Sequence, residues 1–408
     1  MDIKRGLEGV VFAETKLSKI NGQKGELSYC GYDIQDLAEQ ATYEEVAFLL
    51  WYQRLPSRSE LEMLQGWMRG NRLLPKTVWG IMHSLPEGAT SMEALRTITS
   101  TLSMFDKACK HEEVGGSSMC RSVSLTGKLP TIVTSFDRLR RGLPPIEPRE
   151  DLGHAANFLY MLTGEVPGEV SARALETYLV LLAEHGMNPS TFSGRVTSST
   201  RGDIYSAVVT ALGTLKGELH GGANHRVMQQ LMEIERPDRV DEWFERKMEE
   251  GERIFGFGHR VYKSKDPRSA ILKKMSRQAA EHQGNTRWVD IATALEERVL
   301  DHPYFQERNL VTNVDFYSAP LLYALGIRID QFTPMFAMAR IAGWTAHALE
   351  QQRDNRLIRP RAKYVGQEDL QLPSMEDREP AIAIDLEAQC VVGKPANCPA
   401  ALEDPPRF

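Results

Sequence analysis

Residues 254–268, IFGFGHRVYKSKDPR, combine residue types that suit the binding and polarisation of an anionic substrate. Gly256 and Gly258 permit positive φ angles and leave room for a ligand beside the backbone. His259 follows directly, and its side chain is the one that ordinarily titrates near neutral pH. This pattern predicts a site for a small polyanion with a carbonyl group, whereas a flexible basic surface loop is the alternative. Four cations stand within the next nine residues: Arg260, Lys263, Lys265 and Arg268.

Two more histidines and one aspartate lie beside turn or helix-start signals. His220 precedes two glycines in KGELHGGANHRV. N–H groups at a helix start favour anions and keep an imidazole neutral, so that it can donate one N–H to a carbonyl oxygen. His185 follows a helical pattern, and Asp315 precedes an apolar run in NVDFYSAP. Taken alone, Asp315 is more typical of a helix N-cap, but with His259 these residues indicate one site built from distant segments.

The cysteines do not indicate a metal site. Five cysteines without a CxxC pair are typical of a protein in a reducing compartment. Cys109, His111 and Cys120 lack paired spacing and a clear fourth ligand. A metal site built from His220, His225 and His259 is a further alternative, but no carboxylate is clustered with these histidines, so we expect no metal.

Helical periodicity dominates the elements that would position these residues. The segment 42–56 begins with Thr42 as N-cap, has acidic residues in its first turn and stops at Pro56. In 171–186 a leucine stripe precedes Gly186, which we expect to be the C′ residue of that helix. Similar patterns recur as far as residue 355.

Strand-like segments are almost absent. Two short alternating runs flank residues 21–25, NGQKG, which is a hairpin signal. Ala339, Gly343 and Ala346 form a stripe of small residues that favours close packing against another helix. The sequence therefore predicts an all-α fold with a short N-terminal β-hairpin.

Length and composition are those of a globular protein. The 408 residues suffice for two domains, and 42% hydrophobic and 25% charged residues are ordinary values. No run approaches the roughly 18 apolar residues of a membrane span. The N-terminal MDIKRGLEGVVF lacks the features of a targeting segment, so we expect a cytoplasmic protein without a membrane partner.

The net charge of −6 belongs to the C-terminal tail. Nine acidic and three basic residues follow Gly366, so the rest of the chain is neutral and does not favour nucleic acid. The tail, 367–408, contains many prolines and has no helical period, which predicts a mobile or draped segment.

Five motifs resemble the signatures of the citrate synthase family and occur in that family's order. The resemblance extends from about Gly6 to Gly366, and the opening GLEGV and the GYDI at 31–34 match as well. Length and motifs are similar to the shorter bacterial and archaeal type. The motifs are HGGAN (220–224), GFGHRVYKSKDPR (256–268), NVDFYSAP (313–320), RIAGWTAHALEQ (340–351) and NRLIRPRAKYVG (355–366).

The resemblance implies an activity and a role for each matching residue. The family condenses oxaloacetate with acetyl-CoA and then hydrolyses the citryl thioester. Acetyl-CoA is a co-substrate, and no tightly bound cofactor is implied. By resemblance, Asp315 is the base, His220 the donor to the thioester oxygen and His259 the group that polarises the ketone. The expected substrate ligands are His185, Arg268, Arg340 and Arg359, and the expected contacts of the CoA phosphates are Arg260, Lys263 and Lys265.

The resemblance also implies a two-domain architecture and a homodimer. The large helical domain would comprise 1–222 and 325–366, the small inserted domain 223–324, and the tail 367–408. Arg359 would reach the site of the partner subunit. Closure of the domains over oxaloacetate would create the acetyl-CoA site.

Two departures and two rival functions qualify this prediction. Glu218 stands where the family usually has proline and His225 where it most often has glutamate, which we expect to alter contacts but not activity.

A 2-methylcitrate synthase acting on propionyl-CoA would share these motifs, since one methyl group is worth only about 1–3 kcal/mol in an apolar pocket. A non-catalytic paralogue with an assembly or regulatory role is the other rival. The GHRVYK and DFYSAP motifs favour the citrate enzyme, and retention of the catalytic residues opposes a non-catalytic role.

Overall fold

The computed structural model describes residues 3–105 and 116–378. Cys109, His111 and most of the predicted tail lie outside these ranges. The described chain is mainly helical with one small sheet, as predicted. In chain order the elements are η1 (Arg5–Leu7), β1 (Ser18–Asn21), β2 (Glu26–Tyr29), β3 (Tyr32–Asp33), α1 (Ile34–Gln40), α2 (Tyr43–Tyr52), α3 (Arg58–Gly70), α4 (Lys76–His83), α5 (Ser91–Leu102), η2 (Ser103–Phe105), α6 (Gly116–Arg140), α7 (His154–Thr163), α8 (Glu169–Leu182), α9 (Pro189–Ser199), α10 (Ile204–Leu215), α11 (Ala223–Ile234), η3 (Pro237–Arg239), α12 (Val240–Glu249), α13 (Pro267–His282), α14 (Arg287–Leu300), α15 (Pro303–Glu307), α16 (Val314–Ala324), η4 (Ile329–Gln331) and α17 (Phe332–Arg353).

Helix α17 forms the centre of the body. It is buried along almost its whole length, as expected for a helix that is apolar on all sides. It packs against α2, α5, α6, α8, α9 and α10. The small-residue stripe permits one of these contacts, because the Gly343 N–H donates to the Ala183 carbonyl at 3.1 Å, at the end of α8. A Cβ on Gly343 would lie 2.4 Å from that oxygen, so the predicted close packing is confirmed.

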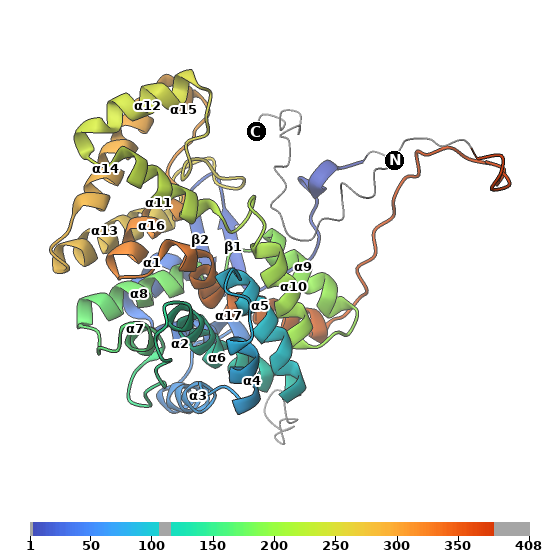
Figure 1. Cartoon of the computed structure of the whole chain (residues 1–408), viewed down its shortest axis with the longest axis horizontal. Coiled ribbons are helices and arrows are strands. Elements are labelled where there is room, and N and C mark those ends of the chain that lie inside the picture. The colour runs from blue at the N-terminus through green and yellow to red at the C-terminus, as the bar shows by residue number, and fades with distance from the viewer. Residues whose placement is uncertain (1–2, 106–115, 379–408) are drawn as a thin grey trace. The chain divides into compact units, whose positions relative to one another are not determined.

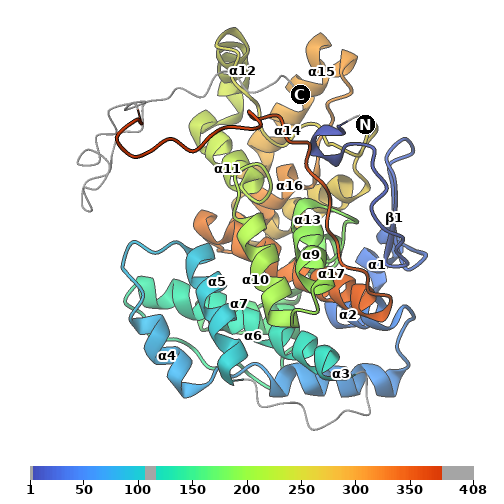
Figure 2. The ribbon, with the colours of Figure 1, turned by 90° about the vertical axis from the view of Figure 1, so that its right-hand side faces the viewer.

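Helices α11 to α16 form a group of their own around residues 254–266, which contain most of the predicted polyanion site and are called the substrate loop below. α13 and α11 pack on α16, and α12 packs on α14. Figures 1 and 2 show α12, α14 and α15 at one end of the body, away from α3 and α4. α13 also packs on α8 and α1, which joins the group to the rest of the body. The division into a large and a small domain stays a prediction.

Two predicted helix boundaries have different outcomes. Thr42 is the N-cap of α2 and forms a capping box with Glu45, as the sequence indicated. Gly186 is not the C′ residue of α8, because the helix ends at Leu182 and Ala183 is its C-cap. The chain turns later, at Gly186, whose φ is +58° and whose N–H donates to the Glu184 carboxylate.

The N-terminal hairpin is confirmed, and a third strand extends it. β1 and β2 are antiparallel, with Ser18 opposite Tyr29 and Asn21 opposite Glu26. β3 is a two-residue strand antiparallel to β2. It was not predicted, since two residues are too short to show an alternating pattern.

Residues 1–358 form one compact unit and residues 359–408 a second. Within the second unit, residues 359–378 are exposed and contain no helix or strand. The Tyr364 hydroxyl donates to the Gln367 carbonyl at 2.8 Å. In the described ranges, no helix is both long and apolar enough to cross a membrane.

Candidate active site

The substrate loop between α12 and α13 owes its shape to two glycines. Gly256 and Gly258 have φ angles of +91° and +82°. A Cβ at Gly256 would lie 2.5 Å from the Phe316 ring, and one at Gly258 would lie 2.9 Å from Leu310. These glycines therefore let the backbone pack closely on its own neighbours, and the ligand space expected from them is taken by Phe316 and Leu310.

His259 is held in one tautomer by the backbone that follows it. Its Nδ1 accepts the N–H groups of Val261 and Tyr262 at 3.0 and 3.2 Å. Nδ1 is therefore unprotonated, and the proton of the neutral ring is on Nε2. Burial, assisted by the charge of Arg268, lowers the pKa of His259 to about 4.

His185 lies beside His259, although 73 residues separate them in sequence. The two ring centres are 5.2 Å apart, and His185 Nε2 is 3.2 Å from the Tyr262 hydroxyl. His185 is buried, and this burial holds its pKa well below the ordinary value, with Arg268 adding to the effect. The two imidazoles are thus both neutral and in edge-to-face contact.

Arg268 is a buried cation at the start of α13. Its Nε and Nη2 donate to the two oxygens of Asp266 at 3.0 and 2.8 Å. Asp266 is also the N-cap of the helix. Burial acts to lower the pKa of Arg268, but the adjacent Asp266 raises it above its ordinary value. The bidentate pair therefore keeps the Arg268 guanidinium protonated despite its burial.

His220 lies in the turn before α11, as predicted. Its Nε2 accepts the Ser190 N–H at 3.3 Å and is 2.8 Å from the Ser190 hydroxyl oxygen. Trp344 Nε1–H donates to the same hydroxyl at 3.0 Å. These contacts make Nε2 an acceptor, so Nδ1 carries the proton. Burial and the charge of Arg340 lower the pKa of His220 to about 4.

Asp315 stands in the first turn of α16 but is not its cap. The cap is Asn313, whose side chain accepts the Asp315 N–H at 3.0 Å. The carboxyl group of Asp315 is therefore available for chemistry. Burial raises its pKa to about 6, Arg268 partly opposes this, and Asp266 adds to it.

Arg340 connects these groups from the middle of α17. It is buried, its Nε donates to the Leu182 carbonyl at 2.6 Å, and its guanidinium lies 4.7 Å from the Phe336 ring centre. Burial lowers the pKa of Arg340, and its charge acts on His185, His220 and Asp315. Helix α8 packs on α17, and α13 and α16 pack on each other and on α8.

The remaining predicted site residues are exposed. Arg260, Lys263 and Lys265 lie on the surface of the substrate loop, and Lys263 is close enough to contribute to the low pKa of His259. Arg359 is exposed and belongs to the unit 359–408, so its role stays a prediction.

Comparison with known proteins decides the family. The model of the citrate synthase C-terminal domain matches residues 6–361. The chain belongs to the citrate synthase family. A citrate synthase of Haloferax volcanii is 47% identical to it over 381 residues, which are 92% of this chain and 99% of that protein.

Two other members extend the comparison. A 2-methylcitrate synthase of Mycobacterium tuberculosis is 42% identical over 372 residues, covering 91% of this chain and 93% of that protein. The citrate synthase of Thermoplasma acidophilum, solved as a ternary complex with carboxymethyl coenzyme A and oxaloacetate, has a TM-score of 0.85 at 30% identity. That comparison covers 92% of this chain and all of the other. The family resemblance and the all-α fold are confirmed.

Sequence reasoning missed several residues that contact the candidate site residues. Tyr262 and Asp266 lie inside the motif 256–268, whereas Ser190 lies outside the quoted motifs. The contacts of these three residues with His185, Arg268 and His220 depend on the fold. Tyr178 is fully buried in α8 between the charges of Asp315 and Arg340. Among the described residues its hydroxyl finds no hydrogen-bond partner. Nothing in its sequence context distinguishes Tyr178 from the apolar residues around it.

The described residues do not support a metal centre. They contain no cluster of three His, Cys, Asp or Glu side chains that could hold an ion. His225, the family departure, has its Nδ1 3.4 Å from the Ile329 carbonyl. It therefore contacts η4 and not the substrate histidines.

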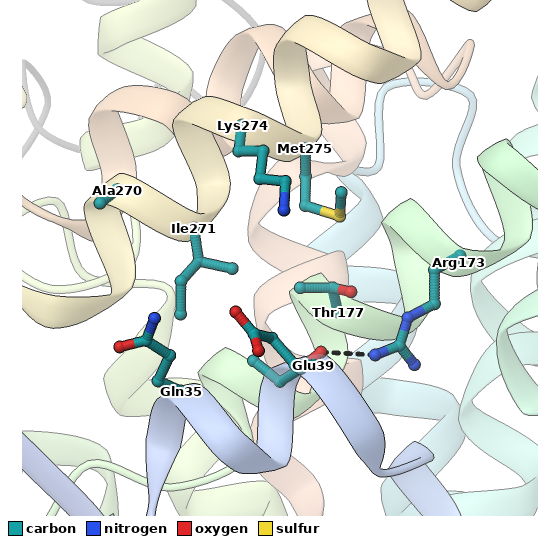
Figure 3. A pocket seen from close by; sticks show the side chains of 9 residues that line it. Gln35, Glu39, Arg173, Thr177, Ala270, Ile271, Lys274 and Met275 are labelled. Atoms are coloured by element: carbon teal, nitrogen blue, oxygen red, sulfur yellow. Dashed lines mark hydrogen bonds between the residues drawn. The ribbon is translucent and has the colours of Figure 1, made fainter.

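A groove of about 500 Å³ lies elsewhere on the body, between α1, α8 and α13. Figure 3 shows Ile271 and Met275 of α13 facing Arg173 and Thr177 of α8 across it. The Arg173 guanidinium donates hydrogen bonds there to the carbonyls of Ala38 and Ala41. None of the predicted site residues lines this groove.

Proposed function

We propose that the chain condenses oxaloacetate with acetyl-CoA and hydrolyses the resulting citryl thioester to citrate and CoA. One observation carries this proposal: two neutral histidines, His220 and His259, are held in opposite tautomers, and Asp315 has a raised pKa. Arg268 acts electrostatically on both His259 and Asp315, and Arg340 acts on both His220 and Asp315. Each histidine has one N–H to offer to an oxygen, and Asp315 can accept a proton. Family membership supports the same reaction.

Oxaloacetate carries two carboxylates, for which guanidinium groups are well suited. Arg268 and Arg340 supply two buried cations, and His185 an additional polar contact. Arg359 would complete the site from the partner subunit of a homodimer. His259 Nε2–H would donate to the ketone oxygen and make the ketone carbon more electrophilic.

Asp315 would remove a proton from the methyl group of acetyl-CoA. This proton is only weakly acidic, so the forming enol needs a donor at its oxygen, and His220 Nδ1–H would supply it. The enol carbon then forms the C–C bond to the ketone carbon, whose oxygen becomes the hydroxyl of citryl-CoA. The proton taken from the methyl group balances the one gained by that oxygen. Water next attacks the thioester carbonyl, the C–S bond breaks, and CoA leaves as the thiol.

The CoA phosphates would bind the exposed cations of the substrate loop. Arg260, Lys263 and Lys265 present three positive charges there. The relative solved with a CoA analogue and oxaloacetate supports both ligands for this family. Acetyl-CoA would be a co-substrate, with no tightly bound cofactor and no metal.

The domain division belongs to the same proposal. The small domain, 223–324, would carry His259 and Asp315, and the large domain, 1–222 with 325–366, would carry His185, His220 and Arg340. Closure would bring these groups together around oxaloacetate and exclude water. Among the described residues the Cys30 thiol forms no disulfide, which is consistent with action in the cytoplasm.

A 2-methylcitrate synthase is the second candidate, supported by the Mycobacterium tuberculosis relative. It would use the same residues on propionyl-CoA. A non-catalytic role is disfavoured, because the chain has His185, His220, His259 and Asp315 in the matching motifs, and His185 and His259 lie in edge-to-face contact.

Thiol release from acetyl-CoA and from propionyl-CoA, followed with Ellman's reagent in the presence of oxaloacetate, tests the proposal. A higher kcat/KM with acetyl-CoA is the expected result. A clear preference for propionyl-CoA would assign the chain to the methylcitrate branch. Folded protein that releases no thiol from either substrate would contradict the proposed activity.

A further inference from the structure

The turn of the N-terminal hairpin packs directly against the substrate loop. A Cβ on Gly22 would lie 2.1 Å from the Val261 carbonyl oxygen, a contact that only glycine permits. The Gly22 carbonyl accepts the Lys263 N–H at 2.9 Å and the Ser264 hydroxyl at 3.2 Å. A Cβ on Gly25 at the other end of the turn would meet the loop backbone as well. The hairpin stands at the edge of the body beside this loop (Figure 2).

The part of the loop that Gly22 touches is the part that orients the histidines. The N–H groups of Val261 and Tyr262 hold Nδ1 of His259, at 3.0 and 3.2 Å. The Tyr262 hydroxyl lies 3.2 Å from Nε2 of His185. Any displacement of the Val261 carbonyl would turn the peptide that supplies the Tyr262 N–H, and with it the imidazole of His259.

The base of the same hairpin holds the segment that carries His185. The Ser18 hydroxyl donates to the Glu184 carboxylate at 3.0 Å and accepts the Gly186 N–H at 3.2 Å. The buried Tyr29 hydroxyl donates to the Glu184 carbonyl at 2.8 Å. The residues on both sides of His185 are therefore tied to β1 and β2.

We propose that the β1–β2 hairpin, residues 18–29, is a brace that sets the position of His185 relative to His259. Its base fixes one histidine and its turn fixes the other, and Gly22 is the positioning residue at the turn. The inference rests on the proposed function, in which both histidines bind oxaloacetate. The hairpin thereby orients the ketone for attack, although none of its residues is among the proposed ligands.

Gly22→Ala tests the brace, with Gln23→Ala as the matched control. Gln23 is exposed in the same turn, whereas the new methyl group at Gly22 must push the Val261 peptide away. We expect kcat/KM for oxaloacetate to fall about 10- to 100-fold in Gly22→Ala, because small displacements of positioning groups have effects of this size. Gln23→Ala should stay within about twofold of wild type, as expected for an exposed substitution.

A spectroscopic measurement separates positioning from stability. The carbonyl stretching frequency of bound oxaloacetate, measured by infrared difference spectroscopy, should shift less in Gly22→Ala than in wild type. If the hairpin only stabilises the fold, Gly22→Ala would lower the melting temperature of the protein and leave this frequency as it is in wild type. Folded Gly22→Ala with wild-type kcat/KM and carbonyl frequency would overturn the proposal.

A second variant covers the case in which Gly22→Ala does not fold. Ser264→Ala removes one hydrogen bond to the Gly22 carbonyl and adds no atoms. Ser264→Ala should reduce the shift of the carbonyl frequency less than Gly22→Ala does. If Ser264→Ala shows the same shift as wild type, the proposed brace is refuted. Wild-type protein that binds oxaloacetate with a shifted carbonyl but releases no thiol would instead contradict the proposed function alone.

Discussion

The protonation of the site histidines is decided by backbone N–H groups. Backbone N–H groups donate to Nδ1 of His259 and to Nε2 of His220. A second proton on either ring would point at such an N–H group, so protonation of the ring is unfavourable. Burial acts in the same direction and lowers both pKa values to about 4. Both rings are therefore neutral single donors at physiological pH, which is the form that can support an enol or a ketone oxygen.

The pH dependence of the reaction should report Asp315. A base must be ionised, and burial raises the pKa of Asp315 to about 6. We expect kcat/KM for acetyl-CoA to rise with pH through about 6 and to level off above it. The histidines titrate lower, at about 4, and should not limit this range. A profile that is flat between pH 5 and pH 7, measured by thiol release, would remove Asp315 from the role of base.

Substitution of Asp315 tests the same role directly. Asp315→Asn retains the shape of the side chain but not the basic oxygen, so turnover should fall by roughly 100- to 10,000-fold, the range for loss of a general base. Oxaloacetate binding, measured by calorimetry, should persist because Arg268 and Arg340 remain. Near-normal turnover would require another base.

Among the elements, the contact between α17 and the end of α8 shapes the candidate substrate site. The segment after α8 contains Glu184, a fully buried carboxylate. Burial acts to raise its pKa, but His347 and Arg340 hold the pKa of Glu184 below the ordinary value. His347 Nε2 lies 2.9 Å from the carboxylate, and Arg195 of α9 contacts the other nitrogen of the same ring. Helices α9 and α17 and the turn after α8 thus share one polar network next to His185.

Gly343 permits this arrangement, and its substitution should disturb it. A methyl group there would lie 2.4 Å from both the Ala183 carbonyl and Glu184 Oε2. We expect Gly343→Ala to lower the free energy of unfolding by about 1–3 kcal/mol, as overpacking does, and to raise KM for oxaloacetate.

Gly80→Ala in α4 is the control, because that position faces open space. It should be neutral or stabilise the protein by up to about 1 kcal/mol, since alanine favours helix over glycine. Urea unfolding and oxaloacetate kinetics on both variants would check this. Equal behaviour of the two variants would contradict a special role for Gly343.

At the scale of the whole molecule, one compact unit assembles most of the site. Residues from 185 to 340 converge within the unit 1–358, whereas Arg359 begins the second unit. This division leaves Arg359 as the group that a partner subunit would contribute in the proposed homodimer. A symmetric dimer would exchange two such residues, one in each direction.

Mixed dimers test this exchange. Chains with Asp315→Asn and chains with Arg359→Ala should each be inactive alone. In a hybrid dimer one site would contain both substitutions and the other neither. Random mixing of equal amounts makes about half of the dimers hybrids, each with one intact site of two, so about a quarter of wild-type activity should return. Thiol release before and after co-refolding measures this. No recovery, with hybrids verified by mass spectrometry, would indicate that Arg359 acts within its own chain.

The sequence alone determined the helical class, the hairpin and the family. Helical periodicity and capping residues such as Thr42 are local properties, so they predict local structure without knowledge of the fold. The motifs around His220, His259 and Asp315 carry the chemistry in the residue types themselves. Local signals were weaker at element ends, where Gly186 suggested a helix terminus that tertiary contacts moved to Ala183.

Tertiary structure decided which groups face one another and in which state. The bidentate pair of Asp266 and Arg268, the tautomer of His220 and the packing of Gly22 on the substrate loop depend on contacts across the fold. The pKa of Asp315 is likewise set by burial among distant segments, with Arg268 opposing the rise. Desolvation and hydrogen-bond geometry depend on the three-dimensional surroundings of a group, and residue types in order along the chain do not contain them.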